Sequence, residues 1–294
     1  MDSIIFGGLI ADRYFNINKY PNRGGDAFIT GEKSYVGGCA INMAAAINNL
    51  GGRAHVVSYV GNDKTGTQIM SYMKKNGFST EFVKTSEGAN GYSMVLKEPD
   101  GEKTFITKKG VEEVFDPSLL EKVDSVNPKT AAVTGYYLLN NNAALIMDCL
   151  EILKVSGVKI LFDPGPFVEY ISPDILKRII KISRVITPNE SEMDVFKALD
   201  KNFIDNFAKG KNIIVLKRGV NGGTVYREGD SFSYKSVSVN TVDSTGAGDS
   251  FAGALVFAMG NRIDIHKAVE LAAICAAKTV QIDAPHGFWK IKEV

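Results

Sequence analysis

Residues 242–255 read VDSTGAGDSFAGAL, a glycine-rich turn that opens a helix of small, apolar residues. Free N–H groups and the helix dipole at the start of such a helix attract anions. Asp249 lies in the first helical turn, where its carboxylate would repel a bound phosphate unless it has another role. Accepting the proton of a hydroxyl that attacks phosphorus is a role that fits. The stretch therefore favours phosphoryl transfer over simple phosphate binding.

Simpler explanations of this stretch exist. Glycines at a strand-to-helix turn can serve backbone geometry alone, and aspartate is common at the start of helices. Two better-known phosphate motifs are absent from it. The chain contains no Gly-x-x-x-x-Gly-Lys-Ser/Thr loop, and Phe251 stands where a dinucleotide fingerprint requires its third glycine.

Length and composition are those of an ordinary globular protein. The 294 residues suffice for one large α/β domain or two smaller ones. No linker, repeat or low-complexity tract divides them, so we expect a single domain over residues 1–294. Apolar residues make up 45% and charged residues 23%, with a formal net charge of +1. This charge gives no strongly basic surface, so neither nucleic acid nor a membrane is an expected partner.

The cysteines and the hydropathy pattern predict a cytoplasmic protein. Cys39, Cys149 and Cys275 are widely spaced and form no CxxC pair. This usage is typical of reduced thiols rather than of a disulfide framework or a zinc site. The first residues lack the basic segment of a signal peptide, and no apolar run approaches the roughly 18 residues of a membrane span.

Short apolar runs alternate with helical patterns along most of the chain. This alternation predicts a mostly parallel sheet covered by helices on both faces, with ligands at the carboxyl ends of the strands. We expect strands at residues 3–10, 55–60, 130–134, 159–163, 184–187 and 212–217, and early helices at 38–50 and 65–76.

Two segments break the alternation. Residues 13–35 and about 91–108 look like antiparallel β pieces, and residues 98–102, Glu-Pro-Asp-Gly-Glu, form the predicted turn of the second. Together they predict a small β-sheet that projects from the main body. Such a sheet can act as a lid or can be a hairpin without that role, and periodicity does not distinguish the two.

A second group of polar and glycine residues lies near the N-terminus. Gly37 and Gly38 precede the first predicted helix, Asn42 lies one turn into it, and Asp12 follows the first predicted strand. Paired glycines let a ligand approach the backbone. The amide and the carboxylate can bind the hydroxyls of a polyol. Singly, Asp12 can cap a turn and Asn42 can satisfy buried backbone, but all four are expected at one edge of the sheet.

Asn189 and Glu192 follow another predicted strand. Oxygen ligands at this spacing can organise Mg²⁺ and its waters. The same residues also suit an ordinary helix start.

Taken in order, these motifs resemble the ribokinase, or PfkB, family of sugar and nucleoside kinases over nearly the whole chain. The matching motifs are Gly37-Gly38 with Asn42, Gly61-x-Asp63-x-x-Gly66, Asn189-x-x-Glu192, Lys217-Arg218-Gly219-x-x-Gly222 and Asp243-x-Thr245-Gly246-Ala247-Gly248-Asp249. The resemblance implies a three-layer α/β/α sandwich with a small β lid, and a homodimer that pairs through the lid.

The resemblance also implies site roles and the cofactors ATP, Mg²⁺ and, in many members, K⁺. It makes Asp249 the base for the acceptor hydroxyl. It makes the N–H groups of Gly246, Ala247 and Gly248 an anion hole for the transferring phosphoryl group. The other implied contacts are Asp12, Gly37, Gly38 and Asn42 with the acceptor, Lys217, Gly219, Gly222 and Thr245 with the nucleotide, Asn189 and Glu192 with Mg²⁺ through water, and Asp243 and Thr245 with K⁺, largely through backbone carbonyls.

Several residues depart from the family pattern or fall outside it. Ser244 replaces a common threonine and keeps the hydroxyl. Cys39 can touch substrate or can be a small buried residue. Lys108 and Lys109 can meet an anionic acceptor or can be a solvated pair. The segment 283–287 is expected to reach the nucleotide or cation site.

The leading hypothesis is an ATP-dependent kinase that phosphorylates a primary hydroxyl of a small sugar or nucleoside. A non-catalytic sugar or nucleotide sensor on the same fold is the alternative. A nicotinamide oxidoreductase is a third class, but the chain lacks the early glycine fingerprint of that class. Ribose, fructose-like sugars, sugar acids and nucleosides all remain open as acceptors.

Overall fold

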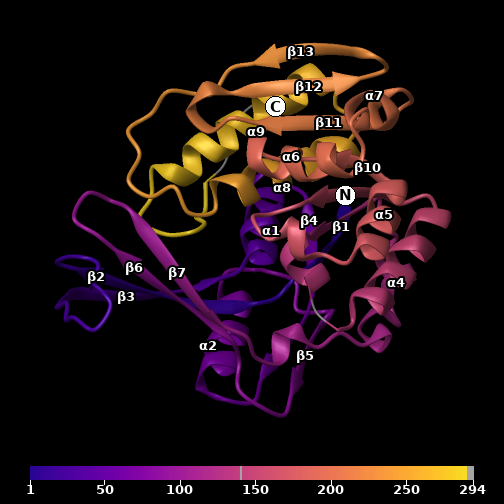
Figure 1. The fold of residues 1–294 in the computed structure, drawn as a ribbon. Helices are drawn as coiled ribbons and strands as arrows, with labels where there is room; N and C mark the ends of the chain where they lie inside the picture. Colours follow the sequence, from indigo (N-terminus) through magenta and orange to yellow (C-terminus); the bar gives the residue numbers. More distant parts are fainter. Residues whose placement is uncertain (140, 290–294) are drawn as a thin grey trace.

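The structure, a computed structural model, describes residues 1–139 and 141–289. Within this part of the chain, strands and helices alternate as the sequence predicts (Figure 1). The helices are α1 (Cys39–Asn49), α2 (Lys64–Lys75), α3 (Val123–Val126), α4 (Ala143–Val155), α5 (Pro173–Ile182), α6 (Glu190–Leu199), α7 (Phe203–Ala208), α8 (Ala247–Gly260) and α9 (Ile265–Val280).

A large sheet forms the centre of the molecule. Its neighbours pair in parallel from β11 through β5, and only β12 and β13 add antiparallel strands at one edge. In spatial order, its strands are β13 (Asp230–Tyr234), β12 (Gly223–Arg227), β11 (Ile213–Lys217), β10 (Ser183–Ile186), β9 (Lys159–Asp163), β8 (Thr130–Thr134), β1 (Asp2–Phe6), β4 (Arg53–Gly61) and β5 (Val83–Ser86).

Alternating side chains divide the core into two layers. Along β1, Ile5 belongs to a core shared with α1, α8 and α9, while Ile4 and Phe6 belong to a core shared with α4, α5 and α6. Successive side chains of a strand point to opposite faces, so helices cover both sides of the sheet. The predicted three-layer, mostly parallel α/β/α fold is confirmed. Among the described residues, no helix is long and apolar enough to cross a membrane.

The first predicted strand was wrong in its extent. Residues 3–10 are not one strand, because β1 ends at Phe6 and β2 begins at Ile10. Gly7 and Gly8 lie in the connection between them. The apolar run continues through this connection because both of its ends are buried, so hydropathy does not mark the point where the chain leaves one sheet for another.

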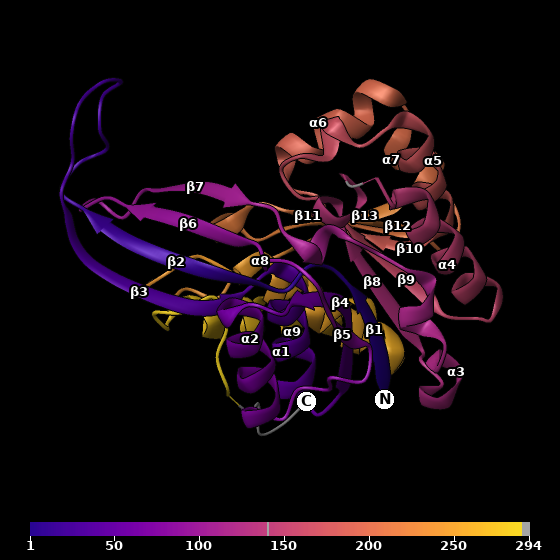
Figure 2. The same ribbon diagram turned by 90° about the horizontal axis from the view of Figure 1, so that it is seen from below.

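A second, four-stranded sheet projects from the main body, as Figure 2 shows. Two hairpins form it, and their inner strands β2 and β6 pair in parallel. The turn at residues 98–102 closes one hairpin through a bond from Glu98 N–H to Glu102 O of 2.9 Å. In spatial order the strands are β3 (Ile29–Gly37), β2 (Ile10–Ile17), β6 (Tyr92–Lys97) and β7 (Lys103–Lys108).

Small residues let α1 and α8 approach each other closely. A Cβ on Gly253 of α8 would stand 2.5 Å from the carbonyl oxygen of Met43 and 3.0 Å from the Cβ of Ala46, both on α1. Both helices begin at the carboxyl edge of the sheet, so this contact also brings their first turns together.

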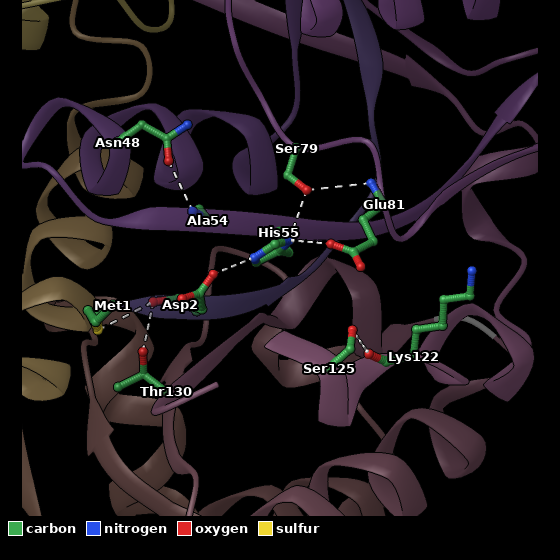
Figure 3. A network of polar contacts seen from close by, with 11 residues as sticks. Met1, Asp2, Asn48, Ala54, His55, Ser79, Glu81, Lys122, Ser125 and Thr130 are labelled. Atoms are coloured by element: carbon green, nitrogen blue, oxygen red, sulfur yellow. Dashed lines mark hydrogen bonds and ion pairs between the residues drawn. The ribbon is translucent and has the colours of Figure 1, made fainter. Parts of the chain in front are cut away.

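At the amino ends of the strands, a buried histidine connects β4 to neighbouring segments. His55 of β4 is fully buried and hydrogen bonds to Asp2 Oδ1 and to Ser79 Oγ, each at 2.8 Å (Figure 3). Nearby, the hydroxyls of Ser3 and Thr130 join β1 to β8 at 2.9 Å. These contacts lie at the amino ends of the strands and stabilise the sheet.

Candidate active site

Asp249 lies in the first turn of α8, as predicted. Gly246 is the N-cap of the helix, with φ +75°, and a side chain on it would overlap the carbonyl oxygen of Pro285. The N–H of Ala247 donates to Ser244 O at 3.3 Å, whereas those of Gly246 and Gly248 donate to no acceptor among the described residues. Two of the three predicted anion-hole donors are therefore open.

The Asp249 carboxylate is held by a chain of hydrogen bonds. Asn42 Nδ2 donates to Asp249 Oδ2 at 2.8 Å, and Asn42 Oδ1 is 2.8 Å from His286 Nδ1. His286 Nε2 is in turn 2.8 Å from the hydroxyl of Tyr72 on α2. Because Asn42 Oδ1 can only accept, His286 carries its proton on Nδ1 and accepts from Tyr72 at Nε2.

Burial sets the charge states of this chain. Burial lowers the pKa of His286 to about 4, so the imidazole is neutral. Burial raises the pKa of Asp249, while the hydrogen bond from Asn42 opposes that rise. Both polar atoms of the Asn42 side chain thus hydrogen bond to protein groups, Asp249 and His286, whereas the family resemblance implies a contact with the acceptor.

Asp12 lies on β2, where the small sheet meets the main body. Its side chain is buried and receives no hydrogen bond from the described residues. A side chain on Gly37 would overlap this carboxylate, so a glycine at this position makes room for it. Gly38 is the N-cap of α1. Burial, and then the charges of Asp249 and Asp243, raise the pKa of Asp12 to about 7. Asp12 and Asp249 therefore lie close enough to repel each other.

A lysine and an aspartate meet at the carboxyl ends of β9 and β11. Lys217 Nζ is 2.7 Å from Asp163 Oδ1, which also accepts a bond of 2.6 Å from the hydroxyl of Thr187. Burial alone would lower the pKa of Lys217, but Asp163 and Glu192 outweigh it and raise it. The ammonium also lies 3.9 Å from where a Cβ of Gly248 would be. Lys217 therefore faces the first turn of α8.

Asn189 and Glu192 form a reciprocal capping box at the start of α6. Asn189 Oδ1 accepts from Glu192 N–H, and Glu192 Oε2 accepts from Asn189 N–H, both at 2.9 Å. Burial raises the pKa of Glu192. The motif therefore serves as an ordinary helix start, one of the two roles that the sequence allows. The charge of Glu192 also contributes to the raised pKa of Lys217, and the charges of Lys217 and Asp163 act on the pKa of Glu192.

Gly219 and Gly222 lie in the loop between β11 and β12, both with positive φ. Arg218 N–H donates to Gly222 O at 2.8 Å, and the guanidinium of Arg218 pairs with Glu190 at 3.0 Å. The loop therefore stands beside the start of α6, at the same edge of the sheet as Lys217.

The side chains of Asp243 and Thr245 already contact a positively charged group, the ammonium of Lys103. Lys103 Nζ of β7 contacts Asp243 Oδ1 and lies 3.1 Å from Thr245 Oγ1. Thr245 N–H donates to the same carboxylate oxygen at 2.7 Å.

Three other residues named from the sequence have neighbours that explain them in part. Lys109 pairs with Glu113 at 2.8 Å, and Lys108 lies 5.9 Å from the centre of the Tyr92 ring. Cys39 is the first residue of α1. Burial, and then the charge of Asp249, raise the pKa of its thiol well above the usual value. Cys39 is thus a neutral thiol near the carboxylate.

Sequence reasoning missed four residues of this region. They are Asp163, Lys103, Tyr72 and, as an individual residue, His286. Asp163 ends a predicted strand at the carboxyl edge, which was a usable signal. Lys103 and Tyr72 carried none, because each acts through a partner more than 100 residues away in the chain.

The fold and the site together describe an α/β sandwich in which an aspartate, Asp249, lies beside helix-start N–H groups that are unbonded within the described part of the chain. The model of the pfkB family of carbohydrate kinases matches residues 5–284. The chain is 26% identical to the uncharacterized sugar kinase YegV of Escherichia coli over 94% of its own length and 88% of the relative's. It is 24% identical to the ribokinase of Mus musculus over 99% and 92% of the two chains.

Solved structures show the same fold. A Burkholderia thailandensis nucleoside kinase in complex with inosine superposes with a TM-score of 0.83 at 21% identity, covering 97% of this chain and 93% of that one. A Methanocaldococcus jannaschii nucleoside kinase also gives a TM-score of 0.83, at 20% identity, covering 99% and 95%. The protein belongs to the pfkB family of carbohydrate kinases and is a sugar or nucleoside kinase.

Proposed function

We propose that this kinase transfers the γ-phosphoryl group of ATP to a primary hydroxyl of a small sugar or nucleoside. The observation that carries the proposal is Asp249, set beside the open N–H groups of Gly246 and Gly248 and held by Asn42. A hydroxyl bound between Asp12 and Asp249 would have an acceptor for its proton. Its phosphorus target would lie against the positive end of the α8 dipole.

The protein's contribution is then positioning and charge stabilisation. Asp249 accepts the proton of the hydroxyl as the bond from its oxygen to the γ-phosphorus forms and the bond from that phosphorus to the leaving ADP breaks. The N–H groups at the start of α8 and the ammonium of Lys217 stabilise negative charge on the phosphoryl oxygens. Asp12 and Gly37 orient the acceptor, and the loop containing Gly219 and Gly222 leaves room for the nucleotide.

Magnesium fits this site as a companion of the nucleotide. Among the described residues, no group of three or more His, Cys, Asp or Glu side chains could hold a metal ion. Mg²⁺ keeps several waters and binds through substrate phosphates with few protein ligands. Asn189 and Glu192 would reach it through water, and the ion would neutralise charge on the phosphates.

A homodimer through the small sheet also belongs to the proposal. Its edge strands β3 and β7 and the chain leading into β3 expose large apolar side chains: Phe28 is 74% exposed, Ile29 60%, Phe105 52% and Ile106 51%. Exposed apolar clusters of this kind mark interaction sites. A second copy of the same sheet would cover them.

An acceptor screen tests the function. The protein is incubated with ATP and Mg²⁺ and with ribose, fructose-like sugars, sugar acids or nucleosides, and ADP and phosphorylated product are both measured. We expect one acceptor class to yield the two products in equal amounts. Tight binding of one acceptor by calorimetry, with no ADP released, would instead identify a non-catalytic sensor.

A further inference from the structure

Lys103 forms a buried ion pair between the small sheet and the main body. It is the first residue of β7, and its ammonium contacts Asp243 Oδ1 and Thr245 Oγ1. The Lys103 side chain is only 9% exposed and that of Asp243 only 1%. By contrast, the pair formed by Lys33 of β3 and Asp283 is about half exposed, so solvent weakens it.

Asp243 requires a cation in this position. Its second oxygen, Oδ2, is buried without a hydrogen-bond partner among the described residues. A buried carboxylate is costly unless a positive charge or hydrogen bonds compensate it. The ammonium of Lys103 contacts Oδ1 of this carboxylate, and Thr245 N–H donates to the same oxygen. Lys103 is therefore the counter-ion of a charged carboxylate.

A potassium ion bound at these two residues would lie directly beside the ammonium of Lys103. The family resemblance implies K⁺ at Asp243 and Thr245, largely through backbone carbonyls, and the ammonium already contacts the side chains of both residues. An ammonium and K⁺ carry the same charge, and two such cations beside one buried carboxylate would repel each other strongly.

The ammonium of Lys103 lies next to the loop that forms the proposed anion hole. Thr245 directly precedes Gly246, and its N–H is fixed by Asp243 at 2.7 Å. Gly246 packs against the carbonyl of Pro285 on its other side. Neutralising Asp243 also limits its repulsion of Asp12, which faces the same region. The charge thus holds the loop that presents the N–H groups of α8.

We infer that Lys103 is a built-in monovalent cation, which takes the place of a bound potassium ion and ties the small sheet to the loop that forms the anion hole. The inference rests on the proposed function. Turnover of the wild-type protein then needs no K⁺, and removal of the ammonium creates a site that K⁺ can fill. Lys103 is a positioning residue, because it contacts the loop and not the reacting atoms.

The test compares two variants at this position in two salts. Lys103→Ala removes the charge and leaves space, whereas Lys103→Met removes the charge and keeps most of the volume. Lys97 lies directly opposite on β6 and makes no ion pair among the described residues, so Lys97→Ala and Lys97→Met are matched controls. Each protein is assayed in potassium chloride and in tetramethylammonium chloride of equal ionic strength. The melting temperature without ligands is measured in parallel.

We expect equal wild-type turnover in the two salts and no salt-specific change in its melting temperature. In tetramethylammonium, Lys103→Ala should lose roughly tenfold or more in kcat, a coupling of ordinary size. K⁺ should restore most of that loss and raise the melting temperature. Lys103→Met should show the loss without the rescue, and the Lys97 variants should behave as wild type.

Three results would overturn the inference: wild-type activity that requires K⁺, a K⁺-specific rise in wild-type melting temperature, or a Lys103→Ala variant that retains wild-type turnover without K⁺. The first two do not depend on the folding of any variant. The melting measurements need no turnover, so they decide the inference even if the acceptor screen finds no kinase activity.

Discussion

Asp12 links acceptor binding to a cost in stability. Its pKa of about 7 lies above the ordinary value of 3.8, so the folded protein keeps a proton that the unfolded chain has lost between these two values. Folding stability therefore falls as the pH rises from about 4 to 7, and above 7 the full cost is present.

The substitution Asp12→Asn should remove that cost. We expect it to stabilise the ligand-free protein by about 1–4 kcal/mol above pH 7, and to have little effect near pH 4. It should also weaken acceptor binding, because a carboxylate acceptor of hydrogen bonds is lost. Denaturant unfolding at the two pH values measures the first effect, and the KM for the acceptor the second. An equal change in stability at both pH values would contradict a raised pKa for Asp12.

His286 and Tyr72 should position Asp249 through Asn42. We expect His286→Ala to lower kcat roughly ten- to a hundredfold, with a smaller effect on the KM for ATP, since a misplaced catalytic group costs about this much. Tyr72→Phe should have the same effect to a lesser degree, because it removes one hydrogen bond and keeps the ring.

His266→Ala is the control for these substitutions. His266 stacks on Phe232 and lies outside this chain of hydrogen bonds. If His286→Ala and Tyr72→Phe both lost stability but kept wild-type kcat, the chain would be structural only.

The contact between α1 and α8 sets the distance from Asn42 to Asp249. Gly253→Ala would place a Cβ against the backbone of α1, so we expect about 1–3 kcal/mol of destabilisation. We also expect a fall in kcat as the first turns of the helices separate. Gly210→Ala meets nothing within 4 Å and should leave both quantities unchanged. A Gly253→Ala variant with normal kcat would show that the site tolerates a wider helix spacing.

Among the secondary-structure elements, the alternation of strands and helices made the layered sheet predictable. The helix start at Asp249 and the turn at residues 98–102 were also evident, because local residue types determine them. The end of β1 at Phe6 was not, because leaving the large sheet for the small one depends on pairing with β3 and β6 rather than on hydropathy. That pairing is a contact between distant segments.

Across the whole molecule, the small sheet should join two copies. We expect sedimentation to show a dimer, and Ile29→Asp combined with Phe105→Asp to give monomers by placing charges in the apolar contact. Val155→Asp on α4 changes an exposed valine on another surface and should leave the dimer intact. A wild-type monomer at micromolar concentration would rule out this assembly.

The candidate site was predictable to the extent that it consists of motifs. Asn42 and Asp249 lie in the first turns of helices at the carboxyl edge of the large sheet, which glycine turns predicted. Asp12 lies within β2 of the small sheet and not, as the sequence had suggested, after a strand of the large one. The ammonium of Lys103 at Asp243 was not predictable, because it depends on how the small sheet closes on the main body. The same holds for His286, which contacts a helix more than 200 residues earlier.

The most direct test of the proposed mechanism is turnover by Asp249→Asn, measured as phosphorylated acceptor formed with saturating ATP and Mg²⁺. Asp264→Asn alters an aspartate that caps α9 and serves as the control. The mechanism predicts a loss of roughly 10²- to 10⁴-fold for Asp249→Asn with ATP affinity retained, and no loss for the control. Turnover close to wild type in Asp249→Asn would contradict it.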